Sequence, residues 1–299
     1  MSVTAFVTAR SVDEALAALT GGARPVAGGT DLVVGARSGK STLPESLVAI
    51  HRVAELRGVS VTADGLRLGA LASHEAICAN PEVQARYSAL ADACAIVGSH
   101  ATRAQGTLGG NLMNASPAME TGGPLICLGA SATLRSASGE RTIAVADLFA
   151  GPGKTVAEPG ELLLSVDAPA PAAGSGSAYL RLEYRRQMEI AVVGASALVT
   201  VDGGTVTDAR VAMTALSPTI RRVPEAEAAL VGSDGGPAAV EAAGAAVAAA
   251  ATPISDVRGS ADYRRAMAAV VTRRAVDTAV RRARGEHVAV PASDTTYGS

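Results

Sequence analysis

The stretch PVAGGTDLVVGAR, residues 25–37, carries a Gly-Gly pair followed by Thr30 and Asp31. A second stretch, GTLGGNLMN at residues 106–114, repeats the Gly-Gly pair with Thr107 before it and Asn111 after it. A tight turn commonly needs one residue at positive φ, whereas paired glycines beside Thr, Asn or Asp can expose consecutive backbone N–H groups next to hydroxyl and amide donors. The two stretches therefore predict either two plain chain reversals or, if they converge, a cradle for a pyrophosphate.

The familiar nucleotide-binding motifs do not account for these glycines. No Gly-x-Gly-x-x-Gly lies between a strand and a helix, which disfavours a Rossmann dinucleotide site. Gly153-Lys154-Thr155 resembles the end of a P-loop, but that motif needs Gly at the position of Leu148. Lys154 is therefore interpreted as a structural residue or a surface charge.

Composition and charge exclude several classes of partner. Hydrophobic residues make up 48% of the chain but include only two Phe and no Trp, which argues against aromatic platforms for single-stranded nucleic acid. The formal net charge is −2 and the arginines are spread along the chain, so no nucleic-acid partner is expected. The first residues lack the pattern of a signal peptide and no apolar run reaches membrane-spanning length. We expect a cytoplasmic protein without a membrane span.

Metal-ligand and hydrolase signatures are also missing. Cys78, Cys94 and Cys127 form no Cys-x-x-Cys pair and have no histidine at ligand spacing, so we expect no metal site and interpret them as buried small side chains. There is no Gly-x-Ser-x-Gly and no His-Glu-x-x-His. Among the four histidines, His100 draws attention because it lies beside the second glycine stretch.

Local patterns predict the order of the elements. Ser11 and Glu14 form a capping box that opens a helix through Leu19. We also expect a strand broken by a glycine turn at 25–36, a helical segment at 81–100, a long structured loop at 106–124, hairpins at 130–145 and around Gly203-Gly204, and helices at 237–251 and 262–283. The last helix and Arg284 directly after it carry seven arginines, which indicate a solvated face or, less simply, a docking surface. The Pro-, Gly- and Ser-rich residues 168–177 predict a linker between two domains.

Six segments, taken together and in order, identify a family resemblance. They are PVAGGTDLVVGAR (25–37), ATRAQGTLGGNLMNASPAME (101–120), DLFAGPGKT (147–155), PGELLLSV (159–166), YLRLEYRRQMEIAVVGASA (179–197) and ADYRRAMAAVVTRRAV (261–276). Over nearly its whole length the chain resembles the FAD-binding medium subunit of the molybdenum hydroxylases, the family of carbon monoxide dehydrogenase and xanthine dehydrogenase.

The resemblance implies an α+β fold. It implies a vanillyl-alcohol-oxidase-type (p-cresol methylhydroxylase-like) FAD-binding domain over residues 1–170, made of two subdomains divided near residue 55. A smaller α+β C-terminal flavoprotein domain of antiparallel strands and helices would cover residues 178–290, after the 168–177 linker.

The resemblance also implies the residues that bind FAD. The first glycine stretch would lie along the diphosphate through Pro25, Val26, Ala27, Gly28, Gly29, Thr30, Asp31 and Leu32. The second would grip it from the other side through Gly106, Thr107, Gly109, Gly110 and Asn111, and Asn114, Ser116 and Glu120 would extend along the ribose and adenine. The wall of the isoalloxazine ring would comprise Val97, Gly98 and Ser99, with Thr102, Leu163 and Arg181 as further contacts.

Two of these positions depart from the family pattern, and two neighbouring arginines allow two interpretations. Glu120 replaces an Asp, and Arg181 replaces a Lys, so the contact of Arg181 with the flavin can be rearranged. Arg185 and Arg186 suit either a flavin contact or an ion pair with Glu183, Glu189 or a neighbouring subunit.

The function implied is electron transfer without a catalytic residue in this chain. FAD, bound non-covalently, would take electrons from [2Fe-2S] clusters in a small partner subunit and pass them to an external acceptor. The substrate would react at a molybdenum cofactor in a large partner subunit, in a dimer of heterotrimers. A free-standing FAD oxidoreductase of the same fold and a flavin-free assembly module are the alternatives.

Overall fold

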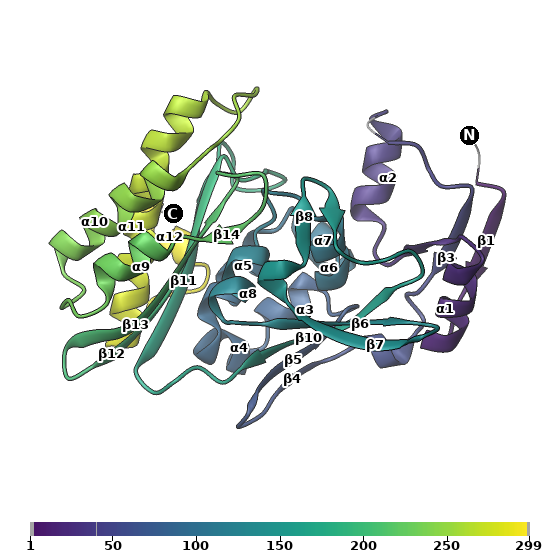
Figure 1. The fold of residues 1–299 in the computed structure, drawn as a ribbon, viewed down its shortest axis with the longest axis horizontal. Coiled ribbons are helices and arrows are strands. Elements are labelled where there is room, and N and C mark those ends of the chain that lie inside the picture. Colours follow the sequence, from purple (N-terminus) through teal and green to yellow (C-terminus); the bar gives the residue numbers. More distant parts are fainter. Residues whose placement is uncertain (1–2, 40, 298–299) are drawn as a thin grey trace.

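The computed structural model describes residues 3–39 and 41–297, which form three blocks arranged side by side (Figure 1). The first block is a parallel sheet in the order β1-β3-β2, built from β1 (Ala5–Thr8), β2 (Arg24–Val26) and β3 (Ser46–Ala49). Helix α1 (Val12–Thr20) begins at Ser11, whose Oγ accepts the Glu14 N–H at 3.1 Å, and the Glu14 carboxylate accepts the Arg10 N–H at 2.7 Å. This confirms the predicted helix start.

The second block is an antiparallel sheet covered on one face by short helices (Figure 1). Its strands, in the order β4-β5-β10-β6-β7, are β4 (Val59–Val61), β5 (Gly65–Gly69), β10 (Leu162–Pro169), β6 (Ser131–Ser136) and β7 (Gly139–Ala144). The helices are α3 (His74–Cys78), α4 (Pro81–Arg86), α5 (Ser88–Ile96), α6 (His100–Gln105), α7 (Leu108–Asn114) and α8 (Gly122–Cys127). Pairing of β6 with β7 confirms the predicted hairpin.

Short elements complete the first two blocks. They are α2 (Thr30–Arg37), the 3-10 turns η1 (Ala54–Leu56) and η2 (Val145–Asp147), and the small ribbon of β8 (Phe149–Gly151) and β9 (Lys154–Thr155).

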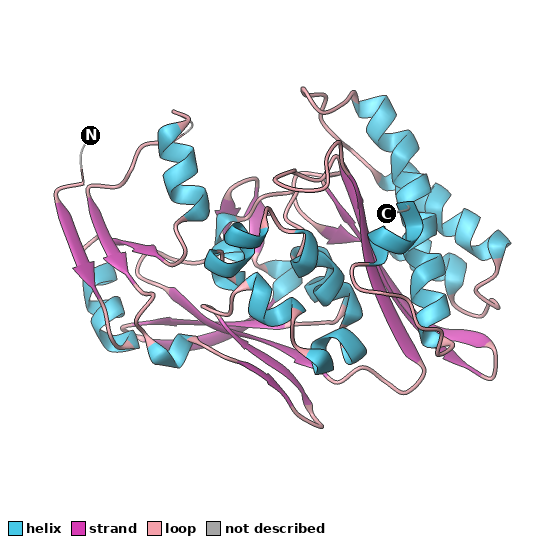
Figure 2. Cartoon of the chain, turned by 180° about the vertical axis from the view of Figure 1, so that it is seen from behind, coloured by secondary structure: helices cyan, strands magenta, loops and turns pink. Residues whose placement is uncertain are grey.

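The C-terminal block is an antiparallel sheet between two helical layers. Its strands are β11 (Ser175–Leu182), β12 (Val193–Asp202), β13 (Thr205–Thr214) and β14 (Arg221–Arg222). Helices α9 (Pro224–Leu230), α10 (Pro237–Ala250) and α11 (Ala261–Ala283) lie on its outer side, as both views show, and α5 and α8 contact its other face (Figures 1 and 2). Gly203 and Gly204 have φ of 54° and 83° in the β12–β13 turn, which confirms that hairpin. Helix α12 (Ala292–Tyr297) follows α11.

Three local expectations are wrong for identifiable reasons. Residues 25–36 continue after the glycine turn as helix α2, not as a strand. The segment 81–100 is not one helix, because Tyr87, at φ −128° and ψ 43°, separates α4 from α5. The expected loop at 106–124 contains α7 and α8, whose glycines lower intrinsic helix propensity and so hid the pattern.

The region between the two sheets is shorter than the predicted linker. Strand β10 extends to Pro169 and β11 begins at Ser175. Most arginines of α11 are used inside the chain: Arg264 pairs with Asp256, Arg273 with Glu241 and Arg282 with Asp92. These ion pairs favour a structural role for the arginine-rich helix.

None of the helices in the described part of the chain is both long and apolar enough to span a bilayer.

Asp92 of α5 fixes the C-terminal block to the middle one. Its side chain is fully buried and accepts two hydrogen bonds from Arg282, at 2.6 and 3.0 Å, and one each from the N–H groups of Tyr179 and Ala292, at 3.2 and 2.9 Å. Ala89, Ala93 and Ile96 of the same helix pack against the Tyr179 ring. The interface between the blocks is therefore an apolar contact organised around one paired carboxylate.

Replacing Asp92 by Asn leaves Arg282 as a buried guanidinium without a counter-charge. We expect D92N to lower the free energy of unfolding by about 3–5 kcal/mol, measured by urea unfolding. The matched control is D167N, which breaks the exposed Arg67–Asp167 pair and should cost at most about 1 kcal/mol. Equal losses in the two variants would contradict the role given to Asp92.

Candidate cofactor-binding site

The two glycine stretches meet in space. A Cβ on Gly28 would lie 2.0 Å from the carbonyl oxygen of Gln105 and 3.2 Å from the Cα of Gly106. The Gln105 side chain donates to the Gly28 carbonyl at 3.2 Å. Gly28 is therefore required by this close approach, and the first stretch packs directly against the residues that open the second.

The first stretch forms the N-terminus of α2. Gly29, at φ 72°, is the N-cap residue and supplies no side-chain cap. The N–H groups of Gly28, Gly29 and Thr30 donate no hydrogen bond within the part of the chain that the structure describes. Free amides at a helix N-terminus favour an anion through both their direction and the helix dipole. Pro25 and Val26 lie in β2, and Ala27 and Leu32 are half-buried beside this turn.

The second stretch forms the N-terminus of α7, and here the amides are already used. The Gly110 N–H donates to Thr107 Oγ1 at 3.1 Å and the Asn111 N–H to the Thr107 carbonyl at 3.0 Å. The Leu108 and Gly109 N–H groups donate to the carbonyls of Ala72 and Ala70, each at 2.9 Å. Free amides were expected from both loops, but in the second stretch the N–H groups of Leu108, Gly109, Gly110 and Asn111 already donate within the chain.

Gly109 has a packing reason of its own. A Cβ there would lie 2.7 Å from the Ala70 carbonyl oxygen, so a larger residue would push α7 away from the end of β5. The second stretch can therefore offer side chains rather than amides. Asn111 accepts from Thr121 Oγ1 at 2.6 Å, which leaves its amide N–H₂ as a donor, while Asn114 is exposed and Ser116 half-exposed just beyond it.

Helix α6 connects the predicted ring wall to the junction of the two loops. Ser99 is its N-cap, accepting the Thr102 N–H at 3.2 Å, and Gly98 adopts a φ of 52°. At the other end, the Gly106 N–H donates to the Thr102 carbonyl at 2.6 Å. Residues 97–99 lead into α6, Thr102 lies on it and Gly106 follows it. All of them therefore belong to one short segment that ends against Gly28.

Arg103 was not predicted and anchors this helix. Its guanidinium is buried and donates to the Val97 carbonyl at 3.2 Å and to His100 Nδ1 at 2.9 Å, and it lies 3.7 Å from Glu75. Because arginine is only a donor, His100 Nδ1 acts as the acceptor and the proton of the neutral ring lies on Nε2.

Glu120 and Arg181 lie together, but in the domain interface. The Arg181 side chain has no exposed area and donates to Glu120, to Glu183 and, at 3.2 Å, to the Glu189 carbonyl. Burial raises the pKa of the Glu120 carboxyl, and the charge of Arg181 opposes this. Leu163, on β10, is also buried. A direct contact of these three side chains with a cofactor stays a prediction.

Arg185 and Arg186 have acidic partners within the chain. Arg185 lies 3.4 Å from Glu189, and Arg186 lies 2.9 Å from Asp294. Arg185 therefore has one of the expected partners, whereas the ion pair of Arg186 is with Asp294, which was not among them.

His74 is a second residue that the sequence analysis missed. Its side chain is buried and its Nδ1 has no hydrogen-bond partner in the described residues. A Cβ on Gly106 would lie 3.4 Å from His74 Cδ2, 3.6 Å from Thr30 Oγ1 and 2.9 Å from the Thr102 carbonyl oxygen. His74 therefore lies at the junction of the loops, where no spacing in the sequence announces it.

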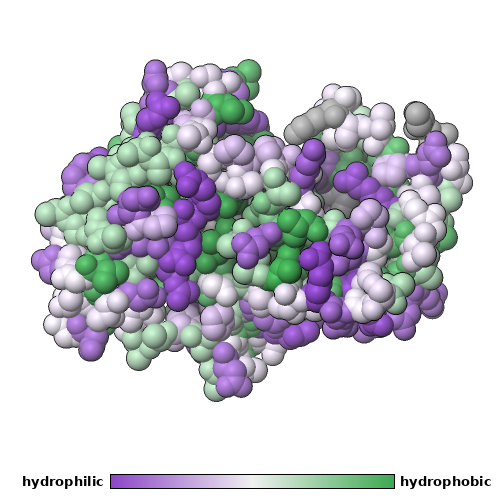
Figure 3. All heavy atoms as spheres, viewed as in Figure 1, coloured by the Kyte–Doolittle hydropathy of each residue, from purple (hydrophilic) through white to green (hydrophobic). Residues whose placement is uncertain are grey.

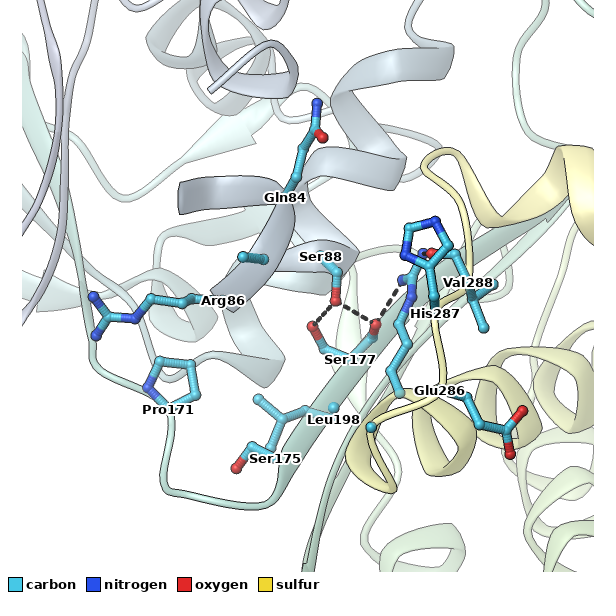
Figure 4. A pocket seen from close by; sticks show the side chains of 14 residues that line it. Gln84, Arg86, Ser88, Pro171, Ser175, Ser177, Leu198, Glu286, His287 and Val288 are labelled. Atoms are coloured by element: carbon cyan, nitrogen blue, oxygen red, sulfur yellow. Dashed lines mark hydrogen bonds between the residues drawn. The ribbon is translucent and has the colours of Figure 1, made fainter. Parts of the chain in front are cut away.

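A cavity elsewhere does not compete with this site. It has a volume of about 280 Å³ and is lined in part by Ser88, Ser177, Arg282 and His287 (Figure 4). Several of its polar groups are bonded to one another: Ser88 Oγ and Arg282 each donate to the Ser177 carbonyl at 2.8 Å. In the space-filling view the upper edge of the molecule is hollowed between the C-terminal block and the segment that carries α2 (Figure 3).

No group of three His, Cys, Asp or Glu side chains that could hold a metal ion occurs among the described residues.

Two family models match the chain. The model described as the FAD binding domain in molybdopterin dehydrogenase matches residues 2–171, and the CO dehydrogenase flavoprotein C-terminal domain matches residues 178–279.

Individual relatives extend the match to nearly the whole chain. The carbon monoxide dehydrogenase medium chain of Afipia carboxidovorans is 33% identical, over 92% of this chain and 96% of its own length. A putative xanthine dehydrogenase FAD-binding subunit of Escherichia coli is 28% identical, over 88% and 91%. A structure of carbon monoxide dehydrogenase from Hydrogenophaga pseudoflava superposes with a TM-score of 0.90 at 33% identity, over 94% of this chain and 98% of that one.

The environment of His74 predicts a pH dependence of stability. Burial, assisted by the charge of Arg103, lowers the pKa of His74 from 6.5 to about 4. The unfolded chain therefore binds more protons between these values, so stability is full above pH 6.5 and falls as the pH decreases toward 4, by about 3 kcal/mol. H74F should flatten urea-unfolding stability across this window. The exposed His51 gives the control, H51F, which should keep the slope of the unchanged protein; an unchanged slope in H74F would contradict the assignment.

Proposed function

This chain belongs to the family of FAD-binding medium subunits of the molybdenum hydroxylases, and on that premise we propose that it binds one FAD non-covalently and relays electrons within a multi-subunit dehydrogenase. Electrons would come from iron–sulfur clusters of a partner subunit and leave to an external acceptor. The family models cover both halves of the chain, and the two relatives match 92% and 88% of it.

The observation that carries the proposal is the unsatisfied amide cluster at the start of α2. The N–H groups of Gly28, Gly29 and Thr30 have no acceptor among the described residues, and Gly28 has no Cβ to separate them from the second stretch. A diphosphate supplies the missing acceptors and the negative charge that a helix N-terminus favours. Each hydrogen bond to a charged group contributes about 1.5–3 kcal/mol, so a few suffice for non-covalent retention.

The residues of the second stretch and of α6 then have distinct tasks. Asn111 offers its side-chain amide to the opposite side of the diphosphate, with Thr107, Gly109 and Gly110 placing it. Asn114 and Ser116 continue along the ribose and adenine. Val97, Gly98, Ser99 and Thr102 form the wall of the isoalloxazine ring. Glu120 and Arg181 bond each other inside the interface between the middle and C-terminal blocks. We therefore assign this pair to the start of the loop that joins β11 to β12.

FAD, when bound, supplies the ability to accept electrons singly and to release them in pairs. The task of the chain is to hold and orient the group and to exclude water from it. No side chain needs to act as a nucleophile or a general base. The molybdenum cofactor and the [2Fe-2S] clusters are assigned to a large and a small partner subunit, and we propose a dimer of heterotrimers.

We further propose a two-subdomain FAD-binding fold of the vanillyl-alcohol-oxidase type over residues 1–170, divided near residue 55. The C-terminal flavoprotein domain would cover 178–290. The parallel sheet of the first block and the antiparallel sheet of the second support this division, since η1 at Ala54–Leu56 leads from one to the other.

The proposal is tested by purifying the chain with its co-expressed partner subunits and recording the visible spectrum and the metal content. We expect a flavin band that is released on denaturation, together with molybdenum and iron. Flavin without either metal would favour a free-standing FAD enzyme. A colourless complex that does not take up added FAD would favour an assembly module and contradict the proposal.

Replacing Gly28 by Ala should weaken FAD retention in that complex. The new Cβ collides with the Gln105 carbonyl, so the amides of the first stretch shift and at least one charged hydrogen bond is lost. We expect the dissociation constant for FAD to rise about tenfold or more. G151A is the control, because a Cβ on Gly151 meets open space. Unaltered FAD binding in G28A would show that the first stretch is not part of the FAD site.

A further inference from the structure

The cavity between the middle and C-terminal blocks is lined by three separate parts of the chain (Figure 4). One wall comes from α4 and α5, one from β11 and the connection before it, and one from the end of α11 and residues 285–288. Its volume of about 280 Å³ is close to the lower end of the range for small-molecule pockets, about 300–1,000 Å³. A small molecule bound here would touch both blocks at once.

Arg86 brings a positive charge to this cavity. Its Nη1 donates to the Thr62 carbonyl at 2.8 Å, and its guanidinium carbon lies 5.7 Å from the centre of the Tyr87 ring. No carboxylate pairs with it in the part of the chain that the structure describes. A guanidinium without a counter-charge in a cavity wall favours an anion as the occupant.

Arg282 supplies a second donor on the opposite wall. Its side chain is only 8% exposed, and its two terminal nitrogens donate to Asp92 and to the Ser177 carbonyl. Its Nε–H, however, has no acceptor within residues 3–39 and 41–297. Buried polar groups nearly always have a partner, so this N–H in a cavity wall indicates a bound acceptor.

The hydroxyl of Ser177 is a third donor. Ser177 Oγ accepts the Ala89 N–H at 3.1 Å, and Ser88 Oγ lies 3.3 Å away, which is long for a bond between two hydroxyls. The O–H of Ser88 already donates to the Ser177 carbonyl at 2.8 Å. The O–H of Ser177 can therefore turn toward a stronger acceptor in the cavity.

The remainder of the wall is apolar or already neutralised. Pro171, Leu198 and Val288 line it, and the last two side chains are buried. The carboxylate of Glu286 accepts from Arg281 at 2.9 Å, and it points away from the pair of serines in Figure 4. The cavity thus combines donors for one anionic group with apolar contact for the rest of a molecule.

A second cavity, of about 300 Å³, lies between the first two blocks and has a different charge pattern. Two of the arginines in its wall are paired, Arg67 with Asp167 at 3.1 Å and Arg135 with Asp13 at 2.8 Å. The carboxylate of Glu55 adds a negative charge to the same wall. Its charges are of both signs, so it does not favour an anion as the first cavity does.

We propose that the cavity between the middle and C-terminal blocks binds a small organic carboxylate with an apolar body. The carboxylate accepts hydrogen bonds from Arg86, from Arg282 Nε and from the hydroxyl of Ser177, and the apolar body lies against Pro171 and Leu198. Because Arg282 also belongs to the buried ion pair that joins the blocks, the bound molecule stabilises their relative orientation.

The test measures dissociation constants by isothermal titration calorimetry on the whole complex with its partner subunits. Benzoate is the probe, benzamide is a neutral molecule of the same shape, and inorganic phosphate is an anion without an apolar body. R86M removes the charge and keeps an unbranched side chain, and A85F fills the cavity from an exposed position on α4. R221M is the matched control, because Arg221 also donates to one backbone carbonyl, that of Ala250 at 2.8 Å, and does not line the cavity.

We expect benzoate to bind the unchanged complex and R221M with the same affinity, and benzamide and phosphate to bind about tenfold or more weakly. R86M loses at least one hydrogen bond to a charged group, so its dissociation constant for benzoate should rise about tenfold or more. A85F should abolish benzoate binding. The flavin content should be the same in all variants, since the cavity is separate from the candidate cofactor site.

Four results would overturn the proposal. The first is no binding of benzoate to the unchanged complex. The second is equal benzoate affinity in the unchanged complex, R86M and A85F, which would locate the probe elsewhere. The third is an equal loss of affinity in R221M and R86M, which would reflect the overall charge of the protein. The fourth is phosphate binding as tight as that of benzoate, which would show a site for inorganic anions.

Discussion

The carboxylate of Asp92 is the point at which four segments of this chain are held together. It belongs to α5, and it accepts hydrogen bonds from Arg282 on α11, from the Tyr179 N–H on β11 and from the Ala292 N–H at the start of α12. A buried carboxylate that loses its partners retains its desolvation cost without compensation, which amounts to several kcal/mol. These segments can therefore shift relative to one another only by breaking that set of bonds, so the C-terminal block has one orientation on the middle block.

The shape of the candidate site follows from this orientation. Helix α5 ends at Ile96, one turn after Asp92, and residues 97–99, the predicted ring wall, follow it directly. Strand β11 runs from Tyr179 through Arg181 into the loop that joins it to β12. Because both elements are fixed at Asp92 and Tyr179, residues 97–99 and this loop meet from different domains, where the Met188 N–H donates to the Gly98 carbonyl. The buried pair of Arg181 with Glu120 repeats the arrangement nearer the site, where it joins the start of the loop to the segment after α7.

Much of this could be predicted from local sequence, and the remainder could not for physical reasons. The capping box at Ser11 and the hairpin at Gly203-Gly204 follow from residue type and spacing, whereas spacing left the convergence of the two glycine stretches as one of two interpretations. The use of the amides did not: whether the Gly109 N–H is free depends on Ala70, a neighbour from another element. His74, Arg103 and Met188 gave no signal, because their roles come from burial and from partners distant in sequence. Met188 is a clear instance, since a positive φ at methionine has no local motif.

The two glycine stretches differ in whether their N–H groups are bonded within the chain. This difference decides how the proposed anion site is linked to the stability of the helices that follow. The amides of Leu108, Gly109, Gly110 and Asn111 are bonded to Ala70, Ala72 and Thr107, so the first turn of α7 needs no ligand to satisfy them. Helix α2 is different: it has eight residues, none of them buried, and no other element packs extensively against it. Helices this short are marginal in water when they lack tertiary packing. An anion bound by the amides at its N-terminus stabilises the helical form, and by linkage the preformed helix raises the affinity for the anion. If the first stretch binds the diphosphate as proposed, the order of α2 and the occupancy of this site are therefore coupled.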